Sequence, residues 1–130
     1  MANTQTIETF LARTGIPYRG VDDGTWILDD EGDEIPPMVI GLAPPLIVFN
    51  CRVAPVTEST GTDQLHKLLE LNATEMTAGA YGVTDGWVVV TETLQSENLD
   101  YNEFNAAVEG IVMSLSSHYA ILKGLVDANA

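Results

Sequence analysis

The segment Leu46-Ile-Val-Phe-Asn-Cys-Arg-Val53 contains the alternation on which the fold of this chain depends. Apolar residues at positions 47, 49, 51 and 53 alternate with residues 48, 50 and 52. Because successive side chains of a strand point to opposite faces of a sheet, a period of two predicts a strand with one buried face. The buried set is expected to be Ile47, Phe49, Cys51 and Val53.

Further strand-like runs lie on both sides of this segment. Residues 25–28 and 38–40 precede it, and the three runs together predict an antiparallel meander. Prolines at 36–37 and 44–45 are expected where strands begin, because proline cannot donate a hydrogen bond within a sheet. Further along, Asp85-Gly86 joins the runs 80–83 and 87–91, which predicts a hairpin.

Helices are expected around these strands. Gly15 lies where a left-handed cap would end the first helix. Asp100 and Glu103 have the spacing of a capping box, which predicts the start of a long last helix. The expected helices cover about residues 4–14, 63–71 and 100–126. The order α-β-β-β-α-β-β-α predicts an α+β fold in which helices cover an antiparallel sheet.

Length and charge exclude several classes of protein. A chain of 130 residues predicts a single domain spanning residues 1–130. Five basic and nineteen acidic residues give a net charge of −14, which argues against binding to nucleic acid or an anionic membrane. One cysteine excludes an intramolecular disulfide and fits a reducing compartment. The chain also has no secretory signal pattern and no apolar run long enough to span a bilayer, so we expect a cytoplasmic location.

Residues 22–34 contain a cluster of carboxylates that could be read as a cation site. The cluster consists of Asp22, Asp23, Asp29, Asp30, Glu31, Asp33 and Glu34. Carboxylate oxygens suit calcium or magnesium, but the spacing lacks the order of an EF-hand loop. A solvated turn that keeps the protein soluble is therefore the favoured interpretation, and no metal or other cofactor is expected.

The residue types used in nucleophilic catalysis are scarce. Cys51 could act only beside His66 or His118, and the alternation places its side chain on an apolar face. His66 precedes Glu70 by four residues, which is the spacing of an ordinary helix-surface pair. His118 is expected to flank the apolar stripe of the last helix. Strand aromatics are expected in the core rather than around a ligand; these are Trp26, Tyr81 and Trp87. The sequence therefore predicts no catalytic residue and no enzyme.

Several local segments occur in an order that resembles the YbjN-type bacterial sensory transduction regulator family. The segments are Ile7 with Gly15-Ile16-Pro17-Tyr18, Trp26-Ile27-Leu28, Leu68-Leu69-Glu70-Leu71-Asn72, Ala80-Tyr81-Gly82-Val83, Asp85-Gly86 and Leu99-Asp100. The resemblance covers nearly the whole chain. That family is similar in fold to the type III secretion chaperones, which are small, acidic and usually dimeric. The resemblance implies the same α-β-β-β-α-β-β-α arrangement and carries over no catalytic residue.

The leading hypothesis is a non-enzymatic protein-binding module of secretion-chaperone type that acts as a homodimer. An apolar groove would hold an extended or amphipathic segment of a client protein, and the acidic charge favours basic clients. One alternative is a regulatory adaptor with a single defined partner in signalling or stress response. Another is a metal or small-ligand binder that uses the acidic loop 29–34. The candidate partner or dimer surface comprises Leu65, Leu68, Leu69, Met113, Ile121 and Leu125.

Overall fold

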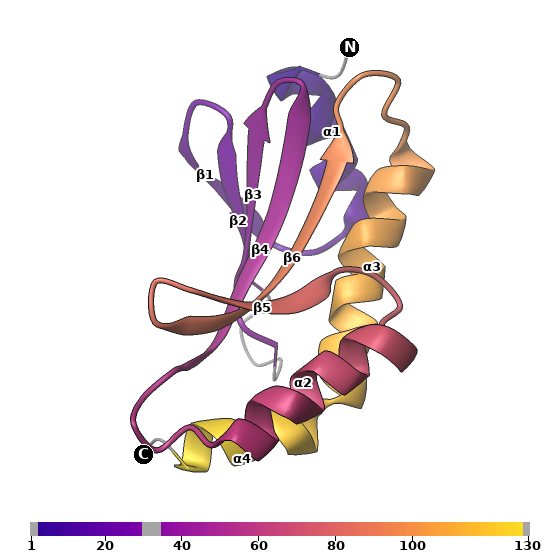
Figure 1. The fold of residues 1–130 in the computed structure, drawn as a ribbon. Helices are drawn as coiled ribbons and strands as arrows, with labels where there is room; N and C mark the ends of the chain where they lie inside the picture. The colour runs from indigo at the N-terminus through magenta and orange to yellow at the C-terminus, as the bar shows by residue number, and fades with distance from the viewer. Residues whose placement is uncertain (1–2, 30–34, 129–130) are drawn as a thin grey trace.

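The protein has an α+β fold built on one antiparallel sheet (Figure 1). The structure, a computed structural model, describes residues 3–29 and 35–128, with side chains as far as residue 125. In chain order the elements are α1 (Thr4–Thr14), β1 (Tyr18–Asp22), β2 (Thr25–Leu28), β3 (Met38–Ala43), β4 (Leu46–Pro55), α2 (Thr62–Thr74), β5 (Ala80–Thr84), β6 (Trp87–Gln95), α3 (Tyr101–Ser117) and α4 (Tyr119–Ala128). The sheet has the strand order β1-β2-β3-β4-β6-β5. The predicted fold class is confirmed.

Local capping and turn signals place the element boundaries. Asn3 Oδ1 accepts a hydrogen bond of 2.9 Å from the Thr6 amide at the start of α1, and Gly15 ends the helix with φ of 77°. Asp100 Oδ1 accepts from the Glu103 amide at 2.8 Å, while the Asp100 amide donates to Glu103 Oε1. The Asn3 and Asp100 side chains therefore each accept from a backbone amide that the first turn of a helix leaves without a partner. The predicted Gly15 cap of α1 and the predicted Asp100–Glu103 capping box of α3 are confirmed.

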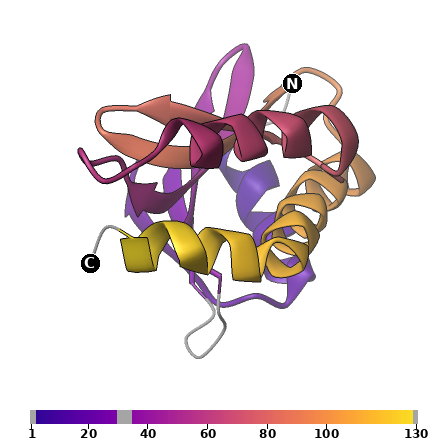
Figure 2. The same ribbon diagram turned by 60° about the horizontal axis from the view of Figure 1, so that its bottom comes forward.

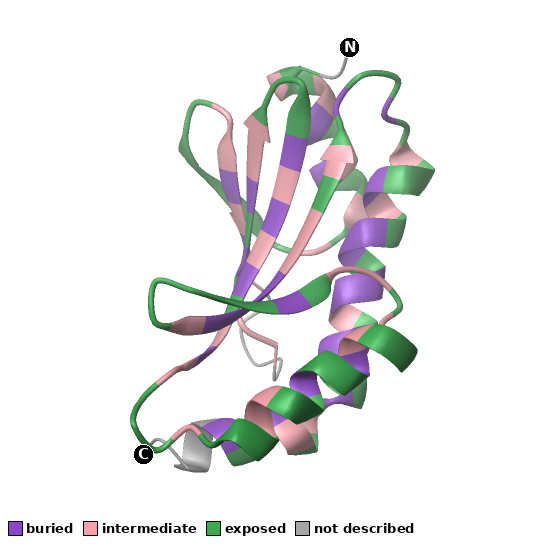
Figure 3. Cartoon of the chain, viewed as in Figure 1, coloured by how far each residue is buried: buried purple, intermediate pink, exposed green. Residues whose placement is uncertain are grey.

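The sheet buries the face that the alternation in β4 predicts. Ile47, Phe49 and Cys51 are fully buried, and the buried and less buried residues of β4 alternate along the strand (Figure 3). Val53 was expected in the same set but is only half-buried. The register shifts between Arg52 and Ala54, so Ala54 takes the inward position and is 1% exposed. A bulge of this kind adds one residue to a strand and reverses the pattern beyond it.

Two elements differ from the expected order. The strand β1 was not predicted, because all five of its residues are exposed and leave no alternation of apolar residues to detect. The expected last helix is divided at His118 into α3 and α4. The chain turns there, so that α4 lies beside α2 at one end of the sheet (Figures 1 and 2). The apolar stripe continues through the break because both helices contribute to one core.

Candidate functional site

A shallow groove runs between α2 and α4 at the helical end of the molecule. It has a volume of about 270 Å³. Its lining comprises Asp63, Gln64 and Lys67 from α2 and Ile121, Gly124 and Leu125 from α4. Figure 2 shows these two helices side by side at the front of the view. The groove has an apolar floor with polar side chains along one edge, an arrangement that suits contact with a polypeptide.

The structure assigns different environments to the three leucines predicted on α2. Leu68 is 4% exposed and belongs to the core, and Leu65 is half-buried against it. Leu69 is 65% exposed. The helical spacing of 100° per residue places Leu69 on the flank of α2 away from the groove residues Asp63 and Lys67. Only Leu69 of the three is therefore available to a partner of the folded monomer.

The other three predicted surface residues lie on α3 and α4. Leu125 is 2% exposed, so it is a core residue that forms the floor of the groove. Ile121 is half-buried and lines the same groove. Met113 is 57% exposed on the side of α3 opposite its buried residues. The structure thus brings Ile121 and Leu125 together, and places Leu69 and Met113 on separate surfaces.

A second hollow lies between the sheet and α3. This apolar pocket has a volume of about 230 Å³. Its lining comprises Ile16, Leu28, Ile35, Pro36, Met38, Val108 and Val112. All of these side chains are apolar. They come from four separate segments of the chain, so no local pattern in the sequence could have grouped them.

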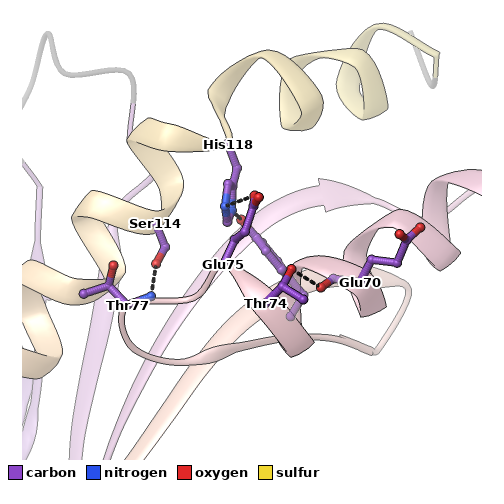
Figure 4. Close-up of polar contacts among 7 residues, drawn as sticks. Glu70, Thr74, Glu75, Thr77, Ser114 and His118 are labelled. Carbon is purple, nitrogen blue, oxygen red and sulfur yellow. Dashed lines mark hydrogen bonds and ion pairs between the residues drawn. The ribbon is translucent and has the colours of Figure 1, made fainter.

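A polar network holds α2, β5 and the α3–α4 junction together. The Tyr81 hydroxyl and His118 Nδ1 form a buried hydrogen bond of 2.8 Å. His118 Nε2 lies 3.9 Å from Glu75 Oε2, and the Thr77 amide donates to Ser114 Oγ at 3.0 Å (Figure 4). His118 is 3% exposed, so its role is to join these elements. The sequence analysis predicted that His118 flanks the apolar stripe of the last helix, but no pattern in the sequence indicated this hydrogen-bond network.

Asn72 covers the outer edge of β5. Its side-chain Nδ2 donates to the Tyr81 carbonyl at 2.9 Å, and its Oδ1 accepts from the Tyr81 amide at 2.6 Å. One amide side chain therefore satisfies both backbone groups of a residue on an edge strand. Free edge groups are templates for pairing with another strand, and Asn72 removes this pair from the β5 edge.

The single cysteine, Cys51, lies in an environment that disfavours reaction of its thiol. Cys51 is fully buried, and burial raises the pKa of its thiol from 9.0 to about 12. The thiolate needed for attack is therefore disfavoured. His66 Nε2 lies 3.3 Å from Glu70 Oε1 on the exposed surface of α2, which confirms the predicted helix pair. Trp26 and Tyr81 are buried as expected, whereas Trp87 is only half-buried.

The acidic cluster is only partly placed. Asp30, Glu31, Asp33 and Glu34 lie outside the described residues. Within the described residues, no group of three or more metal-ligating side chains is arranged to hold an ion. In the same part of the chain, no helix combines the length and apolar character needed to cross a membrane.

Known structures share this fold. A chain of the heterodimeric ExoU–SpcU complex from the type III secretion system of Pseudomonas aeruginosa matches with a TM-score of 0.70 and 18% identity, over 91% of this chain and 98% of that one. Escherichia coli YbjN matches with a TM-score of 0.68 and 21% identity, over 92% of both chains. A chain of the complex between the Yersinia pestis secretion chaperone SycH and a YscM2 fragment matches with a TM-score of 0.60 and 15% identity, over 87% and 97%.

The sequence comparisons define the family. A search of curated proteins finds no match to this chain. The CesT_Tir_1 family model matches residues 1–127. The solved structures agree with that match, since they include YbjN and a complex of a type III secretion chaperone with the same fold. The chain therefore belongs to the CesT_Tir_1 family, the family of type III secretion chaperones.

Proposed function

We propose that this protein is a non-enzymatic, homodimeric binding module that holds an extended or amphipathic segment of a client protein. The family and the fold support this proposal, and two of the similar structures are complexes with a protein partner. The observation that carries it is the apolar pocket between the sheet and α3, whose lining has no charged side chain.

The size and chemistry of this pocket favour a side chain over a small molecule. Its volume of about 230 Å³ is below the roughly 300–1,000 Å³ that is usual for small-molecule sites. It also offers no polar side chain to orient a ligand, whereas an apolar side chain of a client needs none. A peptide anchored there would be selected by burial of that side chain.

We place the dimer contact on the flank of α2 that carries Leu69. This leucine is exposed, while Leu65 and Leu68 face the core of their own monomer. Burying an exposed leucine contributes on the order of 2 kcal/mol, so a symmetric pair of Leu69 side chains would matter to a small interface.

The dimer is tested with a matched pair of substitutions. Leu69→Glu and Met113→Glu both replace a largely exposed apolar residue of a helix by a carboxylate. Light scattering after gel filtration should show a dimer for the parent and for Met113→Glu, and a monomer for Leu69→Glu. A monomeric parent at micromolar concentration would contradict the homodimer.

Client binding is tested on neighbouring residues of α3. Val112 lines the apolar pocket, whereas Met113 faces solvent. Affinity capture from the source cells, followed by quantitative mass spectrometry, should recover the same partner with the parent and with Met113→Glu. Val112→Glu should lose that partner while keeping the circular dichroism spectrum of the parent. Equal recovery by both variants would remove the pocket from the binding site.

A further inference from the structure

The sheet face opposite the core has a composition unlike the rest of this acidic protein. The register of the strands gives one row across it: Arg19, Ile27, Val39, Asn50, Thr91 and Ala80. Paired residues of an antiparallel sheet point to the same face, so these side chains share a surface. Apart from Val89, the residues of this outer face are half-buried or exposed. In the described part of the chain, therefore, no helix buries this face.

The strand residues of the outer face include more basic than acidic side chains, unlike the whole chain. The chain has nineteen acidic and five basic residues. The register places Arg19 and Arg52 on the outer face, and Asp22 at the end of β1 is its one carboxylate among the described strand residues. In residues 3–29 and 35–125, the ion pairs within 4.0 Å involve His66 and His118 and neither of these arginines. Both guanidinium groups are thus exposed without a carboxylate partner from the described residues.

The side chain of Arg52 lies over an aromatic ring on the outer face. Its guanidinium lies 5.2 Å from the centroid of the Trp87 ring. Val89, directly opposite Arg52 in the register, is only 3% exposed although it lies outside the main core cluster. Arg52, Trp87 and Val89 are therefore neighbours on the outer face. A stacked guanidinium keeps its edge free to donate two parallel hydrogen bonds to a carboxylate.

The two arginines are spaced for an extended chain. Arg19 lies on β1, three strands from β4. Asn50 is the β4 residue in the same row as Arg19, and Arg52 lies two residues further along β4. With strands about 4.8 Å apart and a rise of about 3.3 Å per residue, their Cα atoms are about 16 Å apart. Residues i and i+4 of an extended segment lie on one side and are about 13 Å apart. Flexible arginine side chains can make up the difference of about 3 Å between this spacing and the distance between the arginine Cα atoms. Ile27 and Val39 lie between the two arginines.

We propose that the outer face binds an extended acidic segment of a partner protein. Two carboxylates four residues apart pair with Arg19 and Arg52, and an apolar residue midway between them contacts Ile27 and Val39. The charge complementarity of the face favours this occupant over a basic segment, which the rest of the protein would attract. The face is separate from the Leu69 flank and from the apolar pocket, so it does not depend on the function proposed above.

The test uses the full chain and a synthetic heptapeptide. The probe has glutamate, valine and glutamate at alternate positions between threonines, and a control peptide has glutamine in place of both glutamates. Binding is followed by amide shifts of the ¹⁵N-labelled protein. The glutamate peptide should shift Ile27, Val39, Asn50 and Thr91, and should bind more weakly as sodium chloride is added. The glutamine peptide should give much smaller shifts.

Matched variants separate local pairing from overall charge. Arg52→Gln and Lys123→Gln each remove one positive charge, and Lys123 is exposed on α4. We expect Arg52→Gln to weaken binding about five- to tenfold, Arg52→Lys to weaken it less, and Lys123→Gln to leave it within about twofold. The Lys variant keeps the test valid if the Gln variant loses stability.

Several results would overturn the inference. Equal weakening by Lys123→Gln would indicate a general charge effect, and shifts confined to α2 and α4 would place the peptide elsewhere. Displacement of the peptide by millimolar sodium phosphate alone would show a simple anion site. If Arg52→Gln instead changed the sedimentation coefficient of the free protein, the face would be covered by a second copy of the chain.

Discussion

Replacing a helical glycine by alanine should raise the free energy of unfolding at Gly124 in α4, and should leave it unchanged or lower it at Gly110 in α3. In α4, a Cβ at Gly124 would meet nothing within 4 Å. Replacing an unhindered helical glycine by alanine stabilises by about 1 kcal/mol, because glycine loses more backbone freedom on folding. In α3, a Cβ at Gly110 would clash with the Ala78 Cβ and lie 3.2 Å from the Ala78 amide nitrogen.

The loop at Ala78 cannot easily move away from such a Cβ. The Thr77 amide donates to Ser114 Oγ at 3.0 Å, and the Gly79 amide donates to Glu92 Oε2 at 2.9 Å. Overpacking of this kind costs about 1–3 kcal/mol, against the gain of about 1 kcal/mol in helix propensity. We therefore expect Gly110→Ala to lower the free energy of unfolding by up to about 2 kcal/mol.

Urea unfolding followed by circular dichroism measures both effects. The two variants should differ by about 1–3 kcal/mol, with Gly124→Ala above the parent and Gly110→Ala at or below it. All samples need the same protein concentration, because dimerisation would make the apparent stability depend on it. Equal stabilisation by both substitutions would show that the loop at Ala78 yields freely, and would refute the reasoning.

Two further predictions concern buried titratable groups. Tyr81→Phe leaves His118 Nδ1 without its hydrogen bond, so we expect the free energy of unfolding in urea to fall by about 1–2 kcal/mol. The control, Tyr119→Phe, should lower it by less than about 0.5 kcal/mol. Burial raises the pKa of Cys51 from 9.0 to about 12 and that of Tyr81 from 10.0 to about 12. The folded state holds these protons more tightly than the unfolded state, so their contribution to stability is complete below about pH 9 and is lost as the pH rises toward 12. A urea midpoint unchanged between pH 8 and 11 would contradict this assignment.

Local interactions explain why much of the fold could be predicted. The caps at Gly15 and Asp100 depend on residues within one helical turn, and the Asp85-Gly86 turn has the positive φ angles of 51° and 78° that its sequence suggests. The alternation in β4 reports burial because each residue's face depends only on its neighbours along the strand. Such local patterns can be interpreted without knowledge of the rest of the chain.

Contacts between distant segments account for what the sequence did not show. The sequence alone could not divide Leu65, Leu68 and Leu69 between core and surface, because three leucines on one helix satisfy the same periodic pattern. Burial in the folded chain separates them. Likewise, the Tyr81–His118 bond and the pair of arginines on the outer face join residues far apart in the chain. Periodicity describes one element at a time, whereas burial and proximity arise from the way the elements pack.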